Sequence, residues 1–93
     1  MGSKSSRIKL VNFTHDTIHV VVKFDVEKGF SSTTCVKSGE TGIVPCLANA
    51  TSFMIEVEQN GKVARLSAGS SKKLFLVKMK EKVPVIQGGQ KFI

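Results

Sequence analysis

Alternation of apolar and polar residues with a period of two runs through most of the chain, and it restricts the fold more than any other feature. Ile18, Val20 and Val22, for example, fall on one side of their segment. His19 and Lys23 fall on the other side of the same segment. A period of two is typical of β-strands, and the chain has no amphipathic stretch of helix length. The pattern therefore predicts an all-β protein without substantial helix.

Seven segments have this alternation or a strand-like composition, and turn-forming residues separate them. They are residues 7–13, 17–25, 30–37, 42–47, 52–59, 62–66 and 72–80. Residues 83–86 are expected to extend the last of them after a bend. Short strands spaced 8–12 residues apart are typical of sandwiches and small barrels. We therefore expect an antiparallel seven-stranded β-sandwich, immunoglobulin-like or similar, whose strand order the sequence does not determine.

The length of 93 residues is enough for one domain. We expect residues 1–6 to form a flexible N-terminal segment, residues 7–86 the sandwich, and residues 87–93 a flexible basic tail. The sequence has no apolar run of the roughly 20 residues that span a bilayer. It also lacks the apolar core of a signal peptide in its first thirty residues. We therefore expect a cytoplasmic protein.

One hairpin can be placed in register from the sequence. Asn60-Gly61 favours a two-residue type I′ turn. This turn sets Ile55 opposite Leu66 on an apolar side, and Glu56 opposite Arg65 on the other side. A slip of one residue would disrupt both the apolar side and the charge pair.

Two segments have features of edge strands. Residues 30–37 contain mostly small side chains, and residues 42–47 contain Pro45, which has no N–H for a ladder. If these two segments form a hairpin, Cys35 lies opposite Cys46 with a four-residue loop and opposite Pro45 with a five-residue loop. The first arrangement allows a disulfide under oxidation, whereas free thiols are expected in the cytosol.

The net charge of +7 is concentrated at the two ends of the chain. Residues 1–9 contribute +3, residues 10–71 contribute −1, and residues 72–93 contribute +5, because six lysines there oppose one glutamate. Lys78, Lys80 and Lys82 recur at every second position and form a linear basic stripe if their strand stays extended to residue 82. Such charge suits an anionic partner. The alternative is an ordinary solvated edge, on which lysine prevents edge-to-edge pairing.

Few residues point to catalysis or metal binding. His15 and His19 would lie about 13 Å apart on a straight strand, which is too far for two ligands of one zinc ion. We therefore interpret His15, Asp16 and His19 as a polar turn and a surface histidine. No Cys–His pair is close in sequence, although folding can bring one together. No phosphate-binding loop motif is present, and we expect no enzymatic activity, metal, cofactor or small-molecule substrate.

A sequon for N-glycosylation occurs at Asn12-Phe13-Thr14. Without a secretory signal it is expected to remain unmodified. Asn12 also ends the first predicted strand, where a turn-forming residue is common.

The first six residues, MGSKSS, match the M-G-x-x-x-[S/T] pattern for N-myristoylation, which would acylate Gly2. With Lys4, Arg7 and Lys9, this stretch resembles the amino termini of myristoylated signalling proteins of the Src-kinase type. The resemblance covers about nine residues and none of the globular part. The alternative is that MGS is a cloning remnant. Ser3, Ser5 and Ser6 offer phosphorylation sites that would oppose the attraction of the basic residues to a membrane.

These features favour a small non-enzymatic interaction module, N-myristoylated and peripherally bound to an anionic membrane surface at the cytoplasmic side. There it would recruit or organise a protein partner. The predicted membrane-binding side chains are basic: Lys4, Arg7, Lys9, Lys78, Lys80 and Lys82. One alternative is an assembly subunit that self-associates or pairs by β-strand addition. A further alternative is nucleic-acid binding through the basic surface, which is less favoured because few aromatic residues lie among the basic ones.

Overall fold

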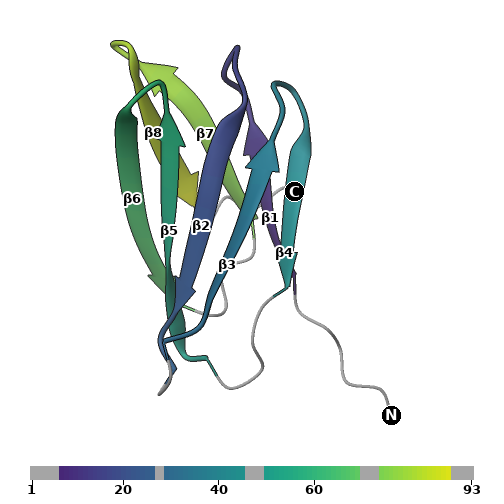
Figure 1. Cartoon of the computed structure of the whole chain (residues 1–93), viewed down its shortest axis with the longest axis vertical. Helices are drawn as coiled ribbons and strands as arrows, with labels where there is room; N and C mark the ends of the chain where they lie inside the picture. Colours follow the sequence, from purple (N-terminus) through teal and green to yellow (C-terminus); the bar gives the residue numbers. More distant parts are fainter. Residues whose placement is uncertain (1–6, 27–28, 46–49, 70–73, 89–93) are drawn as a thin grey trace.

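Two four-stranded β-sheets pack face to face in the computed structural model, which describes residues 7–26, 29–45, 50–69 and 74–88 (Figure 1). Sheet 1 has the strand order β4-β1-β7-β8, and sheet 2 has the order β3-β2-β5-β6. The strands are β1 (Arg7–Asn12), β2 (Ile18–Phe24), β3 (Ser31–Val36), β4 (Thr41–Pro45), β5 (Ser52–Gln59), β6 (Lys62–Gly69), β7 (Leu74–Lys80) and β8 (Val83–Gly88). The predicted all-β fold without helix is confirmed for these residues.

The core lies between the two sheets and consists of the alternate side chains that each strand turns inward. Burial therefore alternates along the strands, as the period of two predicted. Phe53 lies at the centre of an aromatic row, because its ring meets Phe24 and Phe75 edge to face at centroid distances of 6.0 and 5.8 Å. Edge-to-face contacts of this kind add to the stabilisation that burial provides. Because alternate side chains of each strand point into this core, the side chains between them point to solvent.

The structure differs from the predicted fold in strand number and in one pairing. It has eight strands, because residues 83–86 belong to a separate strand, β8, which runs to Gly88. Glu81 and Lys82 both have positive φ, 54° and 68°, and reverse the chain between β7 and β8. The pairing of β1 with β7 is parallel, not antiparallel. Alternation of side chains is the same in both kinds of pair, so the sequence pattern does not distinguish them.

The predicted hairpin is confirmed in every detail. Asn60 and Gly61 have φ values of 53° and 78°, as a type I′ turn requires. The register pairs Ile55 with Leu66 and Glu56 with Arg65. Arg65 Nε donates to Glu56 Oε2 at 2.6 Å.

The two predicted edge strands, β3 and β4, are confirmed as edges, but they belong to different sheets. The hairpin between them that the sequence left open therefore does not form: β3 pairs with β2, and β4 pairs with β1. Gly42 lies where the two edges approach, since a Cβ added to it would lie 2.4 Å from Val36 Cγ2. Cys35 consequently lies opposite His19 rather than opposite Cys46 or Pro45. Cys46 itself lies outside the described residues.

A buried polar cluster connects the end of β1 to both sheets. The Asn12 side chain donates from Nδ2 to the carbonyl oxygens of Asp16 and Val36, both at 2.9 Å. Its Oδ1 accepts from the backbone N–H of Thr14 at 2.9 Å and lies 2.5 Å from the Thr14 hydroxyl. Gln59 Nε2 donates to that hydroxyl at 2.7 Å. Asn12 is fully buried, so the folded protein does not expose the sequon side chain.

Candidate functional site: the outer face of sheet 1

The four strands of sheet 1 contain four basic residues and no acidic residue. Arg7 and Lys9 are on β1, and Lys78 and Lys80 are on β7. All four are exposed, at positions that alternate with buried residues of the core or, for Lys80, with the half-exposed Met79. The outer face of sheet 1, called the basic face below, is thus positively charged and without carboxylates along its strands. Such a face attracts anionic groups.

The parallel pairing of β1 with β7 places the basic residues at two ends of this face. Lys9 pairs with Leu74, and Lys78 follows four residues further along β7. At a strand rise of about 3.3 Å per residue, Lys9 and Lys78 are about 13 Å apart along the strands. Arg7 and Lys80 are about 26 Å apart by the same count. The two basic pairs therefore lie farther apart than the Debye length of about 8 Å at physiological ionic strength, and each can interact with its own anionic group.

Apolar side chains fill the space between the two basic ends. Ile43, Lys9 and Leu74 form one row across β4, β1 and β7. The next row contains Val11 and Leu76 beside Thr41 and Gln87. Ile43 is 50% exposed, whereas Val11, Leu74 and Leu76 are half-buried by their neighbours. The basic face thus combines a central apolar area with positive charge at its ends.

An exposed aromatic residue adjoins the second basic end. Phe13 follows β1 directly, and its backbone N–H donates to the Val77 carbonyl oxygen at 2.7 Å. This bond holds the backbone of Phe13 beside Val77 of β7, the residue before Lys78. Phe13 is 61% exposed, unlike the buried Phe75 on the inner side of the same sheet. An exposed aromatic ring of this kind suits a boundary between an apolar and an aqueous phase.

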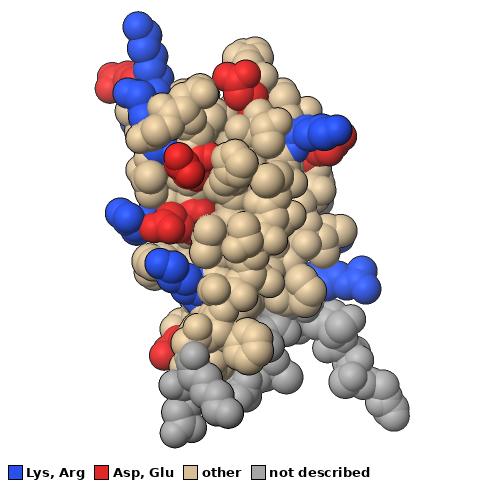
Figure 2. Space-filling view, viewed as in Figure 1, with Lys and Arg blue, Asp and Glu red and all other residues tan. Residues whose placement is uncertain are grey.

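Sheet 2 has a different charge distribution. Its strands contain the acidic residues Glu56 and Glu58 together with basic residues on β2 and β6. Figure 2, drawn from the direction of Figure 1, shows acidic and basic side chains intermingled on the visible face, next to a broad uncharged area. The Arg65–Glu56 ion pair, with a separation of 2.6 Å, illustrates this mixing. Among the strands that the structure describes, positive charge without compensation is therefore a property of sheet 1.

The structure places some of the predicted membrane-binding residues together and separates another from them. Arg7, Lys9, Lys78 and Lys80 share the basic face. Lys82 does not continue the predicted stripe, because β7 ends at Lys80 and Lys82 lies in the turn that follows. The predicted lipidation site, Gly2, lies outside the described residues, as do Lys4 and the three serines at positions 3, 5 and 6.

The sequence alone indicated neither the apolar centre of this face nor the exposure of Phe13. Ile43 lies two residues from Pro45 in a segment that predicted only an edge strand. Leu74 and Leu76 alternate in step with Lys78 and Lys80, and so lie on the same side of their strand. Only the strand order shows that they adjoin Val11. The signal available in the sequence was the absence of acidic residues from the four segments, which becomes informative once these segments are known to form one sheet.

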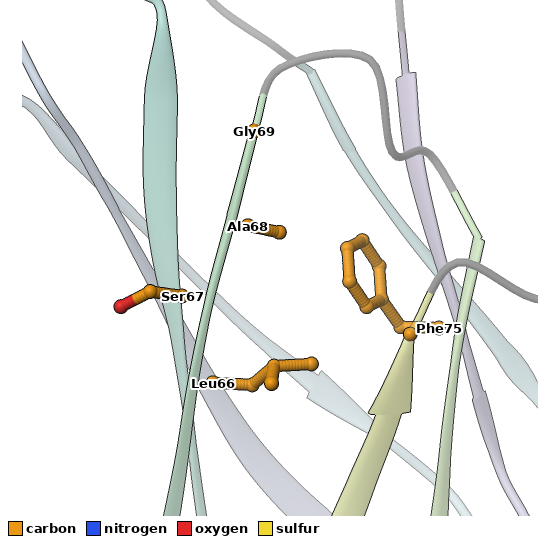
Figure 3. A pocket seen from close by; sticks show the side chains of 6 residues that line it. Leu66, Ser67, Ala68, Gly69 and Phe75 are labelled. Atoms are coloured by element: carbon orange, nitrogen blue, oxygen red, sulfur yellow. The ribbon is translucent and has the colours of Figure 1, made fainter.

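A shallow hollow lies at the opposite flank of the sandwich, where β6 and β8 approach each other. Leu66, Ala68 and Phe75 form its apolar lining, and Gly88 closes one side (Figure 3). A Cβ on Gly88 would lie 2.4 Å from the Phe75 ring. Among the described residues, the lining contains no charged side chain, and the Ser67 side chain points away from the hollow (Figure 3). These lining residues therefore do not supply the convergent polar groups that are typical of a small-molecule site.

The predicted surface positions of two histidines agree with the structure. His15 and Asp16 are exposed in the turn after β1, and His19 is exposed on β2. Among the residues described, no group of three or more His, Cys, Asp or Glu side chains is arranged to hold a metal ion. The fold does bring one Cys–His pair together, since Cys35 Sγ lies 3.3 Å from His19 Nδ1.

Comparison with known proteins gives no relative. No family model, curated protein or solved structure matches the chain. The described residues contain no helix that is long and apolar enough to cross a membrane.

Proposed function

We propose that this protein is a small non-enzymatic interaction module, N-myristoylated at Gly2, that binds peripherally to anionic membrane surfaces. In this proposal it is a cytoplasmic protein that recruits or organises a protein partner at the inner face of a membrane. The basic face is the observation that most supports the proposal. It combines four exposed basic side chains with an apolar centre, and its strands have no carboxylate to repel an anionic headgroup.

Stable binding to a membrane requires both the myristoyl chain and the basic face. A single myristoyl chain binds a bilayer with a constant of only about 10⁴ M⁻¹. Each lysine or arginine close to an anionic leaflet adds about 1 kcal/mol, or slightly less than a factor of ten in affinity. The four basic side chains of sheet 1 would therefore convert marginal binding into stable but reversible binding. They would also make it dependent on salt and on anionic lipid.

The order of the chain supports joint action of the lipid and the basic face. Gly2 precedes Arg7 by five residues, which span at most about 18 Å when fully extended. Arg7 begins β1, an inner strand of sheet 1. An acyl chain at Gly2 is thereby tethered to the sheet that bears the basic face. Phosphorylation at Ser3, Ser5 or Ser6 would add negative charge between the two and weaken binding.

Vesicle sedimentation tests this proposal. Acylated protein should sediment with vesicles that contain phosphatidylserine and much less with vesicles of phosphatidylcholine alone. The Gly2→Ala variant, which cannot be acylated, should lose most binding to both. Neutralising Lys4, Arg7 and Lys9 should weaken binding to the anionic vesicles only. An intact mass of the native protein without a myristoyl group would overturn the lipid half of the proposal. Equal binding to both kinds of vesicle would overturn the electrostatic half.

Strand addition is the second candidate function, and the exposed edges of β3 and β4 favour it. β3 has no charged residue and no proline, which are the usual protection of an edge strand. Phe30, which precedes β3, is 57% exposed. A partner strand, from a second copy or from another protein, would complete the ladder of β3. Sedimentation velocity tests self-association: a mass that rises with concentration supports it, and a monomer at high concentration contradicts it.

We also propose that the sandwich is immunoglobulin-like. Two face-to-face sheets support this, together with connections in which the chain changes sheet between β1 and β2 and between β3 and β4. Immunoglobulin domains of the constant type have seven strands in sheets of four and three. The four-plus-four arrangement here is therefore a departure from that type.

A further inference from the structure

The outer face of sheet 2 contains a Cys–His pair that the proposed function does not use. Cys35 on β3 and His19 on β2 are direct partners in the antiparallel register. Cys35 Sγ and His19 Nδ1 are 3.3 Å apart, within hydrogen-bonding distance for sulfur. Both residues are exposed, and Cys35 is a free cysteine. The thiol and a base that can accept its proton are thus held together by the sheet itself.

The neighbouring groups are arranged in a row across three strands. His19 pairs with Cys35 on one side and with Glu58 of β5 on the other. The order is therefore thiol, imidazole, carboxylate, with the thiol on the edge strand. Thr33 and Lys37 are the exposed residues two positions away along the chain from Cys35. Glu56, which pairs with Val21, is the next charged residue along β5 and lies diagonally from His19.

We propose that Cys35 is a reactive thiol, assisted by His19, that undergoes reversible exchange with small disulfides such as glutathione disulfide. In this step the Cys35 proton moves to His19 Nδ1, and the thiolate attacks one sulfur of the disulfide. A bond forms between Cys35 Sγ and that sulfur while the original S–S bond breaks. The leaving thiolate takes the proton from His19. Cys35 is oxidised and the leaving sulfur is reduced, so the small disulfide is the oxidant.

Two physical arguments favour this assignment over an inert thiol. The thiolate is the nucleophile in disulfide exchange, and an ordinary exposed cysteine is only about 3% thiolate at pH 7. A base at hydrogen-bonding distance can therefore raise the thiolate fraction by up to about thirtyfold at that pH. The exchange rate rises less, by about three- to fourfold, because the nucleophilicity of a thiolate falls as the pKa of the thiol falls. The edge position of β3 also leaves the thiol accessible, because no strand of the described residues pairs with β3 on that side and Cys35 is exposed. Buried structural cysteines have neither property.

The test compares single-thiol proteins in the Cys46→Ser background, so that only Cys35 reacts. Rates of alkylation by iodoacetamide and of exchange with glutathione disulfide are measured between about pH 6 and 9. His19→Gln should slow both reactions about three- to fourfold at pH 7 and should have a smaller effect at pH 9, where an ordinary thiol is already about three-quarters ionised. Lys23→Gln is the matched control: it changes an exposed residue of β2 four positions from His19 and leaves the Cys–His contact in place, so the rates should change by less than about 1.5-fold.

The exposed positions of these residues keep the test interpretable. Substitutions at exposed sites usually alter stability by less than about 0.5 kcal/mol, and a thermal melt verifies that each variant is folded. Intact mass should show one glutathionyl group on the Cys46→Ser protein after incubation with glutathione disulfide, and reductant should remove it. The proposal is overturned if His19→Gln reacts with the same rate and pH profile as its parent. It is also overturned if the folded parent forms no mixed disulfide. Both results are independent of membrane binding.

Discussion

At the scale of single residues, the side chain of Asn12 shows how a polar group can be fixed inside a small β-sandwich. It donates to the carbonyls of Asp16 and Val36 and accepts from Thr14, so it joins β1, the following turn and the end of β3. All buried side-chain nitrogen and oxygen atoms of the described residues have hydrogen-bond partners. A cluster with every member satisfied stabilises one arrangement of the strands, whereas loss of one member leaves its partners unpaired.

Replacement of Asn12 by alanine should therefore lower the free energy of unfolding by about 3 kcal/mol. The lost groups leave the buried Val36 carbonyl and the Thr14 N–H without these partners. Urea denaturation measures the effect. Thr17→Ala is the control, because Thr17 is an exposed residue close by in the chain. A loss of less than about 1 kcal/mol for Asn12→Ala would show that water replaces these hydrogen bonds.

The sequence predicted only part of this cluster. Asn12 was expected to end its strand as a turn former, and it does so. Gln59 lies four positions from Ile55, on the side of the hairpin that was predicted to be apolar, and it is buried there. The contact between the two regions could not be predicted, because it joins residues 45 positions apart through the packing of two sheets.

At the scale of strands and turns, the two hairpins β5–β6 and β7–β8 have the same backbone geometry but different sequences. Asn60-Gly61 tolerates positive φ at both positions, and the sequence predicted this turn. Glu81-Lys82 adopts the same conformation with residues that disfavour it. For this reason the sequence predicted a strand over residues 72–80 that residues 83–86 would extend after a bend, and it did not predict a hairpin here. The pairing of Phe75 with Gly88 and of Val77 with Ile86 determines the turn instead of its local preference.

Substituting Lys82 by glycine should stabilise the protein by about 1 kcal/mol, since glycine adopts positive φ without the penalty of a Cβ. Glu81→Asn should give a smaller gain in the same direction. Thermal unfolding compares each variant with the wild type. The matched control is Gly61→Lys, which places lysine at the equivalent position of the other hairpin and should destabilise by about 1 kcal/mol. If Lys82→Gly leaves the melting temperature unchanged or lowers it, the left-handed turn is not the source of strain.

The approach of β3 to β4 depends on the absence of a side chain at Gly42. A Cβ there would lie 2.4 Å from a methyl group of Val36, which is itself buried in the core. Gly42→Ala should therefore destabilise the protein by about 1–3 kcal/mol, the usual range for overpacking. The double variant Gly42→Ala/Val36→Ala should lose less stability than the sum of the two single variants, because Val36→Ala removes the methyl group with which the new Cβ would clash. Additive losses in the double variant would contradict this explanation.

At the scale of the whole molecule, the distribution of charge follows from the order of strands. The sequence showed that basic residues are concentrated at the two ends of the chain. The parallel contact between β1 and β7 brings these two ends to adjacent strands of one sheet. The sequence could predict the presence of the strands, the alternation of their side chains and the β5–β6 register, because these depend on local patterns. The strand order and the assignment of each strand to one of the two sheets were not predictable, because long-range strand pairing has no local signature in a single sequence.

The most direct test of the account is a comparison of two triple variants of the acylated protein in binding to phosphatidylserine vesicles. One replaces Lys9, Lys78 and Lys80 of the basic face by glutamine. The other replaces Lys23, Lys37 and Lys62, which are exposed outside it, and lowers the net charge equally. We predict about 100-fold weaker binding for the first variant, at about 1 kcal/mol per residue, and less than about threefold for the second. Equal losses in the two variants would show that net charge, and not the basic face, determines binding.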